Sequence, residues 1–249
     1  MTAGPPHETG FLDRVVKDDG IQSRYQLYVP ANFDRSADWP VILSLHGAGE
    51  RGNDGLLQTA IGLGNAIRRH RELIPAVVVF PQVPADGLWL GQSERIALHA
   101  LHAAVAECGG DPDRIYVVGL SMGGYGAWEM ASAQPERFAA IVSVCGGVTP
   151  PATGATMLQP PQVAENAPDP FAAVAARVAP IPAWLFHGAD DTIVPPMQSR
   201  TLVAALRIAG GDPRYTEYPD VGHNSWDRAF AEPELWTWLL AQKRPLASH

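Results

Sequence analysis

The chain has 249 residues, a hydrophobic fraction of 46% and a formal net charge of -8 at pH 7. This length and apolar content suit one large α/β domain with a substantial core. The acidic balance, with both signs mixed along the chain, argues against nucleic acid or an anionic membrane surface as the main partner. The composition therefore favours a small, neutral or modestly polar molecule as the substrate.

No segment approaches the run of about 20 apolar residues that a membrane span needs, and the N-terminal stretch has no basic start followed by an apolar run. We therefore expect a cytoplasmic protein without a membrane partner. Cys108 and Cys145 are the two cysteines, and neither belongs to a CxxC pair. We interpret both as buried thiols, with a single disulfide between them as the alternative.

Two strand-like stretches open the chain, FLDRVVKDD (11–19) and SRYQLYVP (23–30). The dipeptide Asp19-Gly20 between them is typical of a tight hairpin turn, which predicts an antiparallel pair. The next apolar stretch, WPVILSLHGAG (39–49), does not alternate and ends in glycines. Such runs are typical of strands that are covered on both faces.

From there, helical and strand patterns alternate along the chain. Helices are predicted over 56–70, 93–108, 123–133, 197–210 and 232–242, and strands over 76–82, 114–121, 138–147, 182–191 and 214–221. This alternation predicts an α/β fold with an eight-stranded, mostly parallel sheet and helices on both faces.

One segment, 148–180, interrupts the alternation. It is rich in Pro and Ala and longer than an ordinary connection. Long connections of this kind are functional lids or plain surface loops, and the sequence favours neither. The stretch FAAVAARV (171–178) within it predicts a short helix. We treat residues 1–249 as one domain that carries this segment as a candidate lid.

The motif GxSxG occurs as Gly119-Leu120-Ser121-Met122-Gly123, directly after an apolar strand and before a predicted helix. That context is what a nucleophilic serine on a tight strand-to-helix turn requires. The alternative is a glycine-rich turn with an incidental serine.

A serine hydroxyl needs a base, and His223 in the loop PDVGHNSWD is the candidate. His46 and His187 each end an apolar strand just before a glycine, and we interpret both as structural histidines. An acid that orients the base should lie between serine and base in the chain, where HGADDTIVP offers Asp190 and Asp191. Spacing alone does not choose between the two.

An oxyanion hole needs two backbone N–H groups. Met122, directly after the serine, is expected to supply one of them. Ala48 in the loop after VILSLHG is expected to supply the other, with Gly49 beside it near the substrate.

The segments LHGAGERG, GLSMGGYGAWEMA, VCGG, HGADDTIVP and YPDVGHNSWD resemble, in order and spacing, serine esterases of the α/β-hydrolase superfamily often catalogued as predicted peptidases, close to feruloyl and acetyl esterases and to polyhydroxybutyrate depolymerase-like esterases. The resemblance covers residues 10–242 and implies an α/β-hydrolase fold. It implies Ser121 as nucleophile, Asp191 as acid, His223 as base and Ala48 as an oxyanion donor.

These observations predict a serine carboxylesterase that hydrolyses small acyl or aryl esters without a metal or organic cofactor. Trp89 and Trp226 are candidate walls of the substrate pocket, with a core or rim position as the alternative for each. A serine peptidase acting on short peptides is the second hypothesis. A non-catalytic protein that uses the α/β-hydrolase fold to bind a small ligand is the third.

Overall fold

The computed structural model describes residues 8–150 and 158–244. Its centre is one eight-stranded sheet with the strand order β1-β2-β4-β3-β5-β6-β7-β8. The strands are β1 (Gly10–Asp18), β2 (Ile21–Val29), β3 (Trp39–Leu45), β4 (Val77–Pro81), β5 (Gly110–Leu120), β6 (Ala140–Val144), β7 (Ala183–Gly188) and β8 (Arg214–Tyr218). The α/β prediction, including the number of strands, is confirmed.

The antiparallel part of the sheet is confined to one edge. β1 and β2 form a hairpin, and β2 also pairs antiparallel with β4. Asp19 (φ 46°) and Gly20 (φ 80°) make the turn, both in the left-handed region that a tight hairpin of this kind requires. The remaining pairs are parallel, so the carboxyl ends of β3, β5 and β7 lie at the same edge of the sheet.

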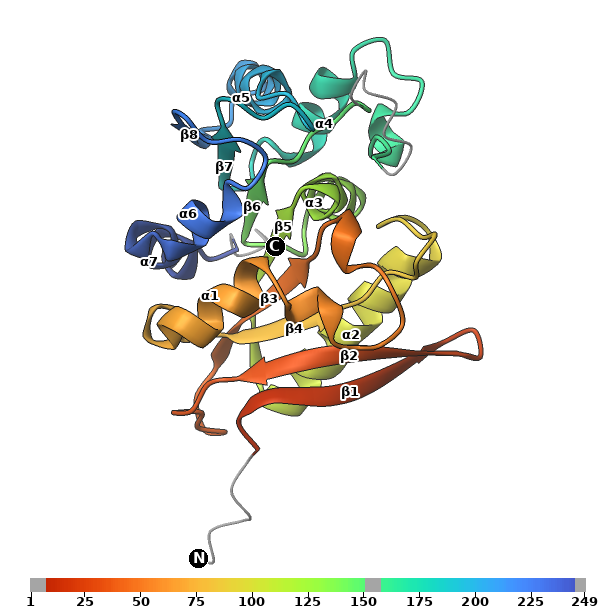
Figure 1. Ribbon diagram of the computed structural model, residues 1–249, viewed down its shortest axis with the longest axis vertical. Helices are drawn as coiled ribbons and strands as arrows, with labels where there is room; N and C mark the ends of the chain where they lie inside the picture. The colour runs from red at the N-terminus through yellow and green to blue at the C-terminus, as the bar shows by residue number, and fades with distance from the viewer. Residues whose placement is uncertain (1–7, 151–157, 245–249) are drawn as a thin grey trace, which may run out of the picture.

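Helices cover both faces of the sheet, and Figure 1 shows one group of helices on each side of it. Their bounds are α1 (Gly62–His70), α2 (Gln92–Cys108), α3 (Met122–Ala133), α4 (Pro170–Val178), α5 (Met197–Ile208), α6 (Trp226–Ala231) and α7 (Pro233–Ala241). Side chains of α2, α3, α4 and α5 belong to one apolar core, and those of α1, α6 and α7 belong to the other. Neighbouring residues of β5 alternate between the cores, Val117 in the first and Val118 in the second.

Two helix predictions were incomplete. The helix predicted over 56–70 begins at Gly62, after a short 3-10 turn at Leu57–Thr59. Gly62 has φ +59°, so the helix cannot run through it, and a Cβ at Gly64 would overlap the main chain of Thr59. The sequence reading also missed α6, a six-residue helix directly after the loop of His223.

The interrupting segment is partly ordered. The predicted short helix is confirmed as α4, whose first turn is capped by Asp169 accepting a hydrogen bond from the Ala172 N–H. A 3-10 turn, Gln162–Ala164, precedes it. Residues 151–157 lie outside the described part of the chain, so the lid remains a prediction.

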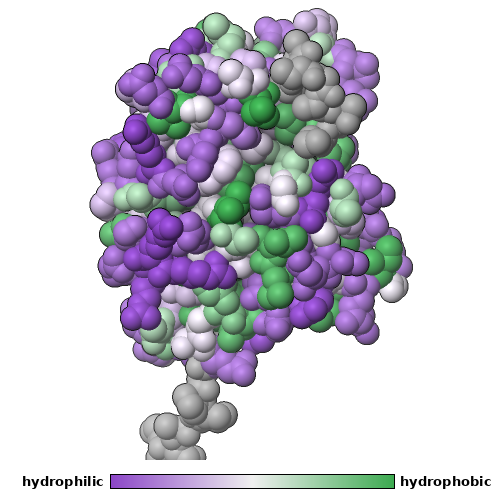
Figure 2. Space-filling view, viewed as in Figure 1, coloured by the Kyte–Doolittle hydropathy of each residue, from purple (hydrophilic) through white to green (hydrophobic). Residues whose placement is uncertain are grey.

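Both cysteines are free and buried, which agrees with the thiol interpretation. Among the described residues, no helix is long and apolar enough to cross a membrane. On the face that Figure 2 shows, hydrophilic side chains predominate and apolar ones form small separate patches. The two large apolar clusters consist of buried residues and lie on opposite faces of the sheet.

Candidate active site

Ser121 stands on the turn between β5 and α3, with φ 51° and ψ -118°. A non-glycine residue in this region is strained, as expected of a nucleophile on a very tight turn. A Cβ at Gly119 would overlap the carbonyl of Gly123, and a Cβ at Gly123 would overlap the carbonyl of Leu45. The glycines of the motif are therefore required because main chain passes main chain at contact distance on both sides of Ser121.

Ser121, His223 and Asp191 are joined by hydrogen bonds. His223 Nε2 lies 2.9 Å from Ser121 Oγ, and His223 Nδ1 lies 2.7 Å from Asp191 Oδ2. A carboxylate can only accept, so Nδ1 carries the proton and Nε2 is the acceptor for the serine hydroxyl. The structure thus brings together the three residues that the sequence separates by 32 and 102 positions.

Asp191 is buried, with 4% of its surface exposed. Its Oδ1 accepts two backbone hydrogen bonds, from Ile193 and Val194, each 2.9 Å long. Burial raises the pKa of this carboxyl, but the hydrogen bonds from His187, His223 and Val194 outweigh it and hold the pKa well below its usual range. Asp191 is therefore an anion at neutral pH.

The neighbouring acid has a different environment. Asp190 is exposed, and its backbone N–H donates to the carbonyl of Val221. Of the two acids that spacing left open, Asp191, the one that the resemblance implies, faces His223.

The loop after β3 lies against the nucleophile. A Cβ built at Gly47 would sit 3.6 Å from the Cβ of Ser121, and the short 3-10 turn Ala48–Glu50 starts at the next residue. Met122 is the first residue of α3, where a backbone N–H has no acceptor within the helix. Met122 follows Ser121 directly and Ala48 follows Gly47, so both lie in segments next to the serine; the oxyanion hole that they would form stays a prediction.

His46 holds this loop in place. Its Nδ1 donates to the carbonyl of Gly47 (2.6 Å), and its Nε2 accepts from the N–H of Val83 (3.0 Å). The His46 carbonyl in turn accepts from the indole N–H of Trp89. These bonds need a neutral imidazole, and burial lowers the pKa of His46 to about 4.

This buried histidine predicts a pH dependence of stability. Because burial depresses its pKa from 6.5 to about 4, the unfolded chain binds the proton before the folded protein does. The stabilisation is fully present above pH 6.5 and is lost as the pH falls to 4, by about 3 kcal/mol in total. Urea unfolding at pH 7 and pH 4.5 measures the loss. It should be smaller in His46→Gln and unchanged in the control His102→Gln, an exposed histidine; equal losses in wild type and His46→Gln would refute this assignment.

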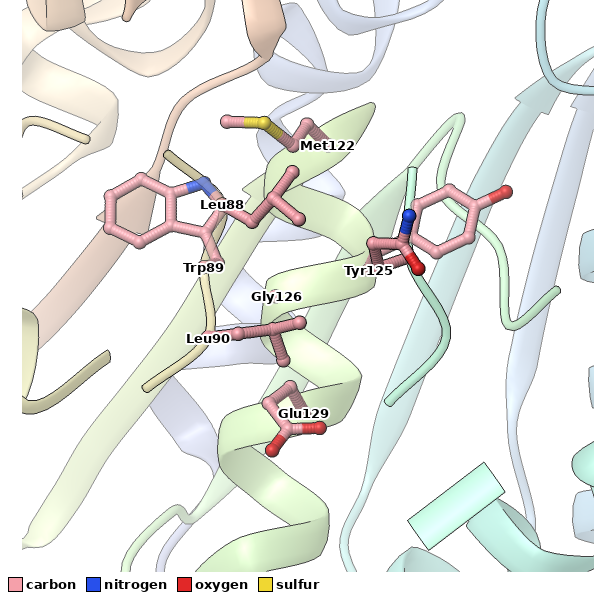
Figure 3. A pocket seen from close by; sticks show the side chains of 8 residues that line it. Leu88, Trp89, Leu90, Met122, Tyr125, Gly126 and Glu129 are labelled. Atoms are coloured by element: carbon pink, nitrogen blue, oxygen red, sulfur yellow. The ribbon is translucent and has the colours of Figure 1, made fainter. Parts of the chain in front are cut away.

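The two tryptophans occupy different positions. Trp89 is 2% exposed and lines a pocket with Met122, Tyr125 and Glu129, in which the residues of α3 lie along one face of the helix (Figure 3). Trp226, the first residue of α6, is half-buried and sets its ring edge-on to the ring of His223, with the centroids 5.6 Å apart. Both therefore border residues of the site.

Gly49 lies in the open part of the loop. A Cβ built on it would meet nothing within 4 Å, and the residue is exposed.

The sequence reading missed two side chains that position the loop after β6. Tyr125 donates its hydroxyl to the carbonyl of Thr149 (2.9 Å), and Gln198 Oε1 accepts from the N–H groups of Val148 and Thr149. Gln198 lies on α5, so these bonds tie the start of the interrupting segment to two helices. Neither residue belongs to a motif that marks it in the sequence.

Cys145, Asp191 and His223 offer ligand atoms within 4.8 Å of one another, which is a grouping that could hold a metal ion. Two ligands of one tetrahedral ion with bonds of about 2 Å lie roughly 3.3 Å apart. His223 Nδ1 and Asp191 Oδ2 are closer, at 2.7 Å, and satisfy each other directly. The donor set therefore fits a hydrogen-bonded pair better than a metal centre.

The fold and the arrangement of these side chains are those of serine hydrolases of the α/β-hydrolase superfamily. The chain belongs to the prolyl oligopeptidase family, whose model matches residues 97–240.

A thermostable esterase of known crystal structure is 32% identical, with a TM-score of 0.78 over 94% of this chain and 63% of that one. A ferulic acid esterase is 16% identical, with a TM-score of 0.70 over 94% of this chain and 99% of that one, which shows a shared fold. An uncharacterized secreted protein of Arthroderma benhamiae is 28% identical over 221 residues, 78% of this chain and 22% of that protein. The chain thus spans less than two thirds of the esterase and about a fifth of the fungal protein.

Proposed function

We propose that this protein is a serine carboxylesterase that hydrolyses small acyl or aryl esters through an acyl-enzyme. The observation that carries the proposal is the hydrogen-bonded series Ser121–His223–Asp191 at the end of β5. A serine hydroxyl bonded to a neutral imidazole, which is itself bonded to a buried carboxylate, can lose its proton as it attacks a carbonyl carbon.

In the acylation step, Ser121 Oγ bonds to the carbonyl carbon of the ester while its proton passes to His223 Nε2. The N–H groups of Met122 and Ala48 hold the oxyanion. The C–O bond to the alcohol then breaks, and the alcohol leaves with the proton from His223. Asp191 stays ionised and stabilises the imidazolium.

Deacylation repeats this sequence with water. His223 takes a proton from the water, whose oxygen bonds to the acyl carbon. The bond to Ser121 Oγ breaks, the acid is released, and the proton returns to Ser121. Each residue ends the cycle in its starting protonation state, so this chemistry needs no metal or organic cofactor.

For the substrate, we propose that Trp89 and its neighbours form one wall of the pocket and that Trp226 and Gly49 border the other side of the site. The pocket beside Met122 is small and is lined by the apolar side chains of Leu88, Trp89 and Leu90, by Tyr125 and by Glu129, which favours a small acyl group there. The similarity to a thermostable esterase supports ester chemistry. We place this activity in the cytoplasm.

The family name favours a second candidate, a serine peptidase that acts on short peptides. The same three residues can serve both reactions, but an amide is harder to cleave because its leaving amine must be protonated. A protein that binds a small ligand without catalysis is the third candidate, and the complete hydrogen-bonded triad speaks against it.

The test is hydrolysis of p-nitrophenyl esters of increasing acyl length and of methyl ferulate, with p-nitroanilides of short peptides alongside. Replacing Ser121 with Ala removes the nucleophile, so kcat should fall by about 10⁴-fold or more while the fold, checked by thermal unfolding, persists. Fast turnover of p-nitroanilides would favour the peptidase. If wild-type protein neither cleaves these compounds nor reacts with an organophosphonate, the esterase proposal is wrong.

A further inference from the structure

A second histidine contacts the proposed catalytic acid from the side of β7. His187 has no exposed surface, and its Nε2 lies 3.3 Å from Asp191 Oδ2. The same nitrogen lies 2.8 Å from the carbonyl oxygen of Val194, and Nδ1 lies 2.7 Å from Ser199 Oγ on α5. Every polar atom of this buried ring therefore has a partner, and one of those partners is Asp191.

The partners determine where the proton of His187 lies. A backbone carbonyl can only accept, so Nε2 must carry a hydrogen to bond to Val194. Asp191 Oδ2 lies within reach of that same N–H. In the neutral ring, Nδ1 then accepts, and the Ser199 hydroxyl donates to it. In the only neutral tautomer that satisfies these contacts, the Nε2–H group therefore bonds to Val194 and lies 3.3 Å from Asp191 Oδ2, close enough for the carboxylate to share it.

The Asp191 carboxylate consequently receives N–H groups on both oxygens. Oδ1 accepts from the backbone N–H groups of Ile193 and Val194. Oδ2 accepts from His223 Nδ1 at 2.7 Å, and His187 Nε2 lies 3.3 Å from the same oxygen. The bonds on Oδ1 and the bond from His223 already oppose rotation about the Cβ–Cγ bond. The Nε2–H group of His187 lies beside Oδ2 from the side of β7 and therefore limits how far this oxygen can shift away from His223 Nδ1.

Two further polar groups near Asp191, the Tyr125 hydroxyl and the Cys145 thiol, carry no charge that would hold it. Burial raises the pKa of Tyr125 and of the Cys145 thiol, and the negative charge of Asp191 raises both further. Both groups are therefore neutral at physiological pH. The Tyr125 hydroxyl is directed to Thr149 instead.

We propose that His187 is a positioning residue: it holds the Asp191 carboxylate in the orientation that aligns His223 with Ser121. This inference rests on the proposed function. His187 touches no reacting atom, so its loss should lower the rate of the chemical step and leave substrate binding unchanged. A misplacement of about 1 Å in such a site costs up to roughly 100-fold.

The matched variants are His187→Gln and His187→Asn. A Gln amide extends to about the position of Nε2 and can still donate to Asp191, whereas an Asn amide corresponds to Nδ1 and reaches only Ser199. With p-nitrophenyl acetate, His187→Asn should lower kcat, and the rate of Ser121 labelling by an organophosphonate, by about 10- to 100-fold with KM unchanged. His187→Gln should recover most of the loss, and Ser199→Ala should stay within about threefold of wild type.

If a variant does not fold, the protonation of His187 can be measured in the wild-type protein. Nitrogen chemical shifts of ¹⁵N-histidine-labelled protein report which ring nitrogen of each histidine carries hydrogen. We expect His187 to be protonated at Nε2; a ring with a bare Nε2 would overturn the proposal, as would equal kcat in the Gln and Asn variants. This measurement needs no activity, so a protein that is inactive on every ester would refute the esterase proposal and leave the role of His187 decided by the spectrum.

Discussion

Replacing Asp191 with Asn is expected to lower kcat for ester hydrolysis by about 10⁴-fold, the loss typical of a Ser-His-Asp triad without its carboxylate. The Asn amide N–H would face the His223 nitrogen that now donates to Asp191 Oδ2. His223 would then present a protonated Nε2 to Ser121, which cannot accept the serine proton. KM and the unfolding midpoint should change far less than kcat, and steady-state kinetics with p-nitrophenyl acetate measure the difference.

The adjacent acid supplies a matched control. Asp190→Asn removes the same charge one residue away, at an exposed position whose backbone N–H alone is tied to Val221. We expect kcat to stay within about twofold of wild type, because the side chain does not reach His223 and an exposed charge contributes little. Comparable losses in the two variants would show that the loop as a whole, rather than the Asp191 carboxylate, supports catalysis.

Replacing Gly123 with Ala is expected to destabilise the protein by about 3 kcal/mol or more, because the added Cβ would overlap the carbonyl of Leu45. Main chain lies on both sides of this contact, so neither partner can move without displacing β3 or α3. Such a loss is a large fraction of the stability of an ordinary domain. Denaturant unfolding at neutral pH measures it, and the variant should yield little folded protein.

Gly49→Ala is the control for that substitution. It adds the same methyl group in the loop beside the proposed oxyanion donor, but into open space and at a backbone conformation that alanine adopts. Its free energy of unfolding should match the wild-type value within about 0.5 kcal/mol. If Gly123→Ala were as stable as Gly49→Ala, the close approach of β3 and α3 would not be what requires glycine in the motif.

Much of the architecture could be predicted because the pattern that reports it is local. Unbroken apolar runs mark β3 and the second half of β5, which are buried on both faces, and the alternation of strands with helices implies a parallel sheet. The helix predicted from residue 56 begins later, because Gly62 has a positive φ. A glycine in a sequence can adopt a positive φ, but the sequence does not show whether it does. The short helix α6 carries too few residues for a helical period to show.

The candidate site divides in the same way. Ser121 can be recognised from its neighbours in the sequence, because the tight strand-to-helix turn leaves no room for a Cβ at the glycines on either side of it. Two acids in one turn carry the same local pattern, and the difference between Asp190 and Asp191 lies in which one the turn directs toward a loop 32 residues further along.

The sequence by itself determined the class of fold, the candidate nucleophile and the order in which the candidate serine, acid and base occur, because each follows from residue type and near-neighbour spacing. The family resemblance pointed to Asp191 where spacing left two acids open, and the structure shows that Asp191 meets His223. The tertiary structure alone decided that His46 holds the loop of Ala48 and that His187 Nε2 lies 3.3 Å from Asp191 Oδ2. Those assignments depend on directions of side chains across the ends of parallel strands. The directions of these side chains depend on packing between segments that are far apart in the chain, so they cannot be predicted from a local pattern of residues.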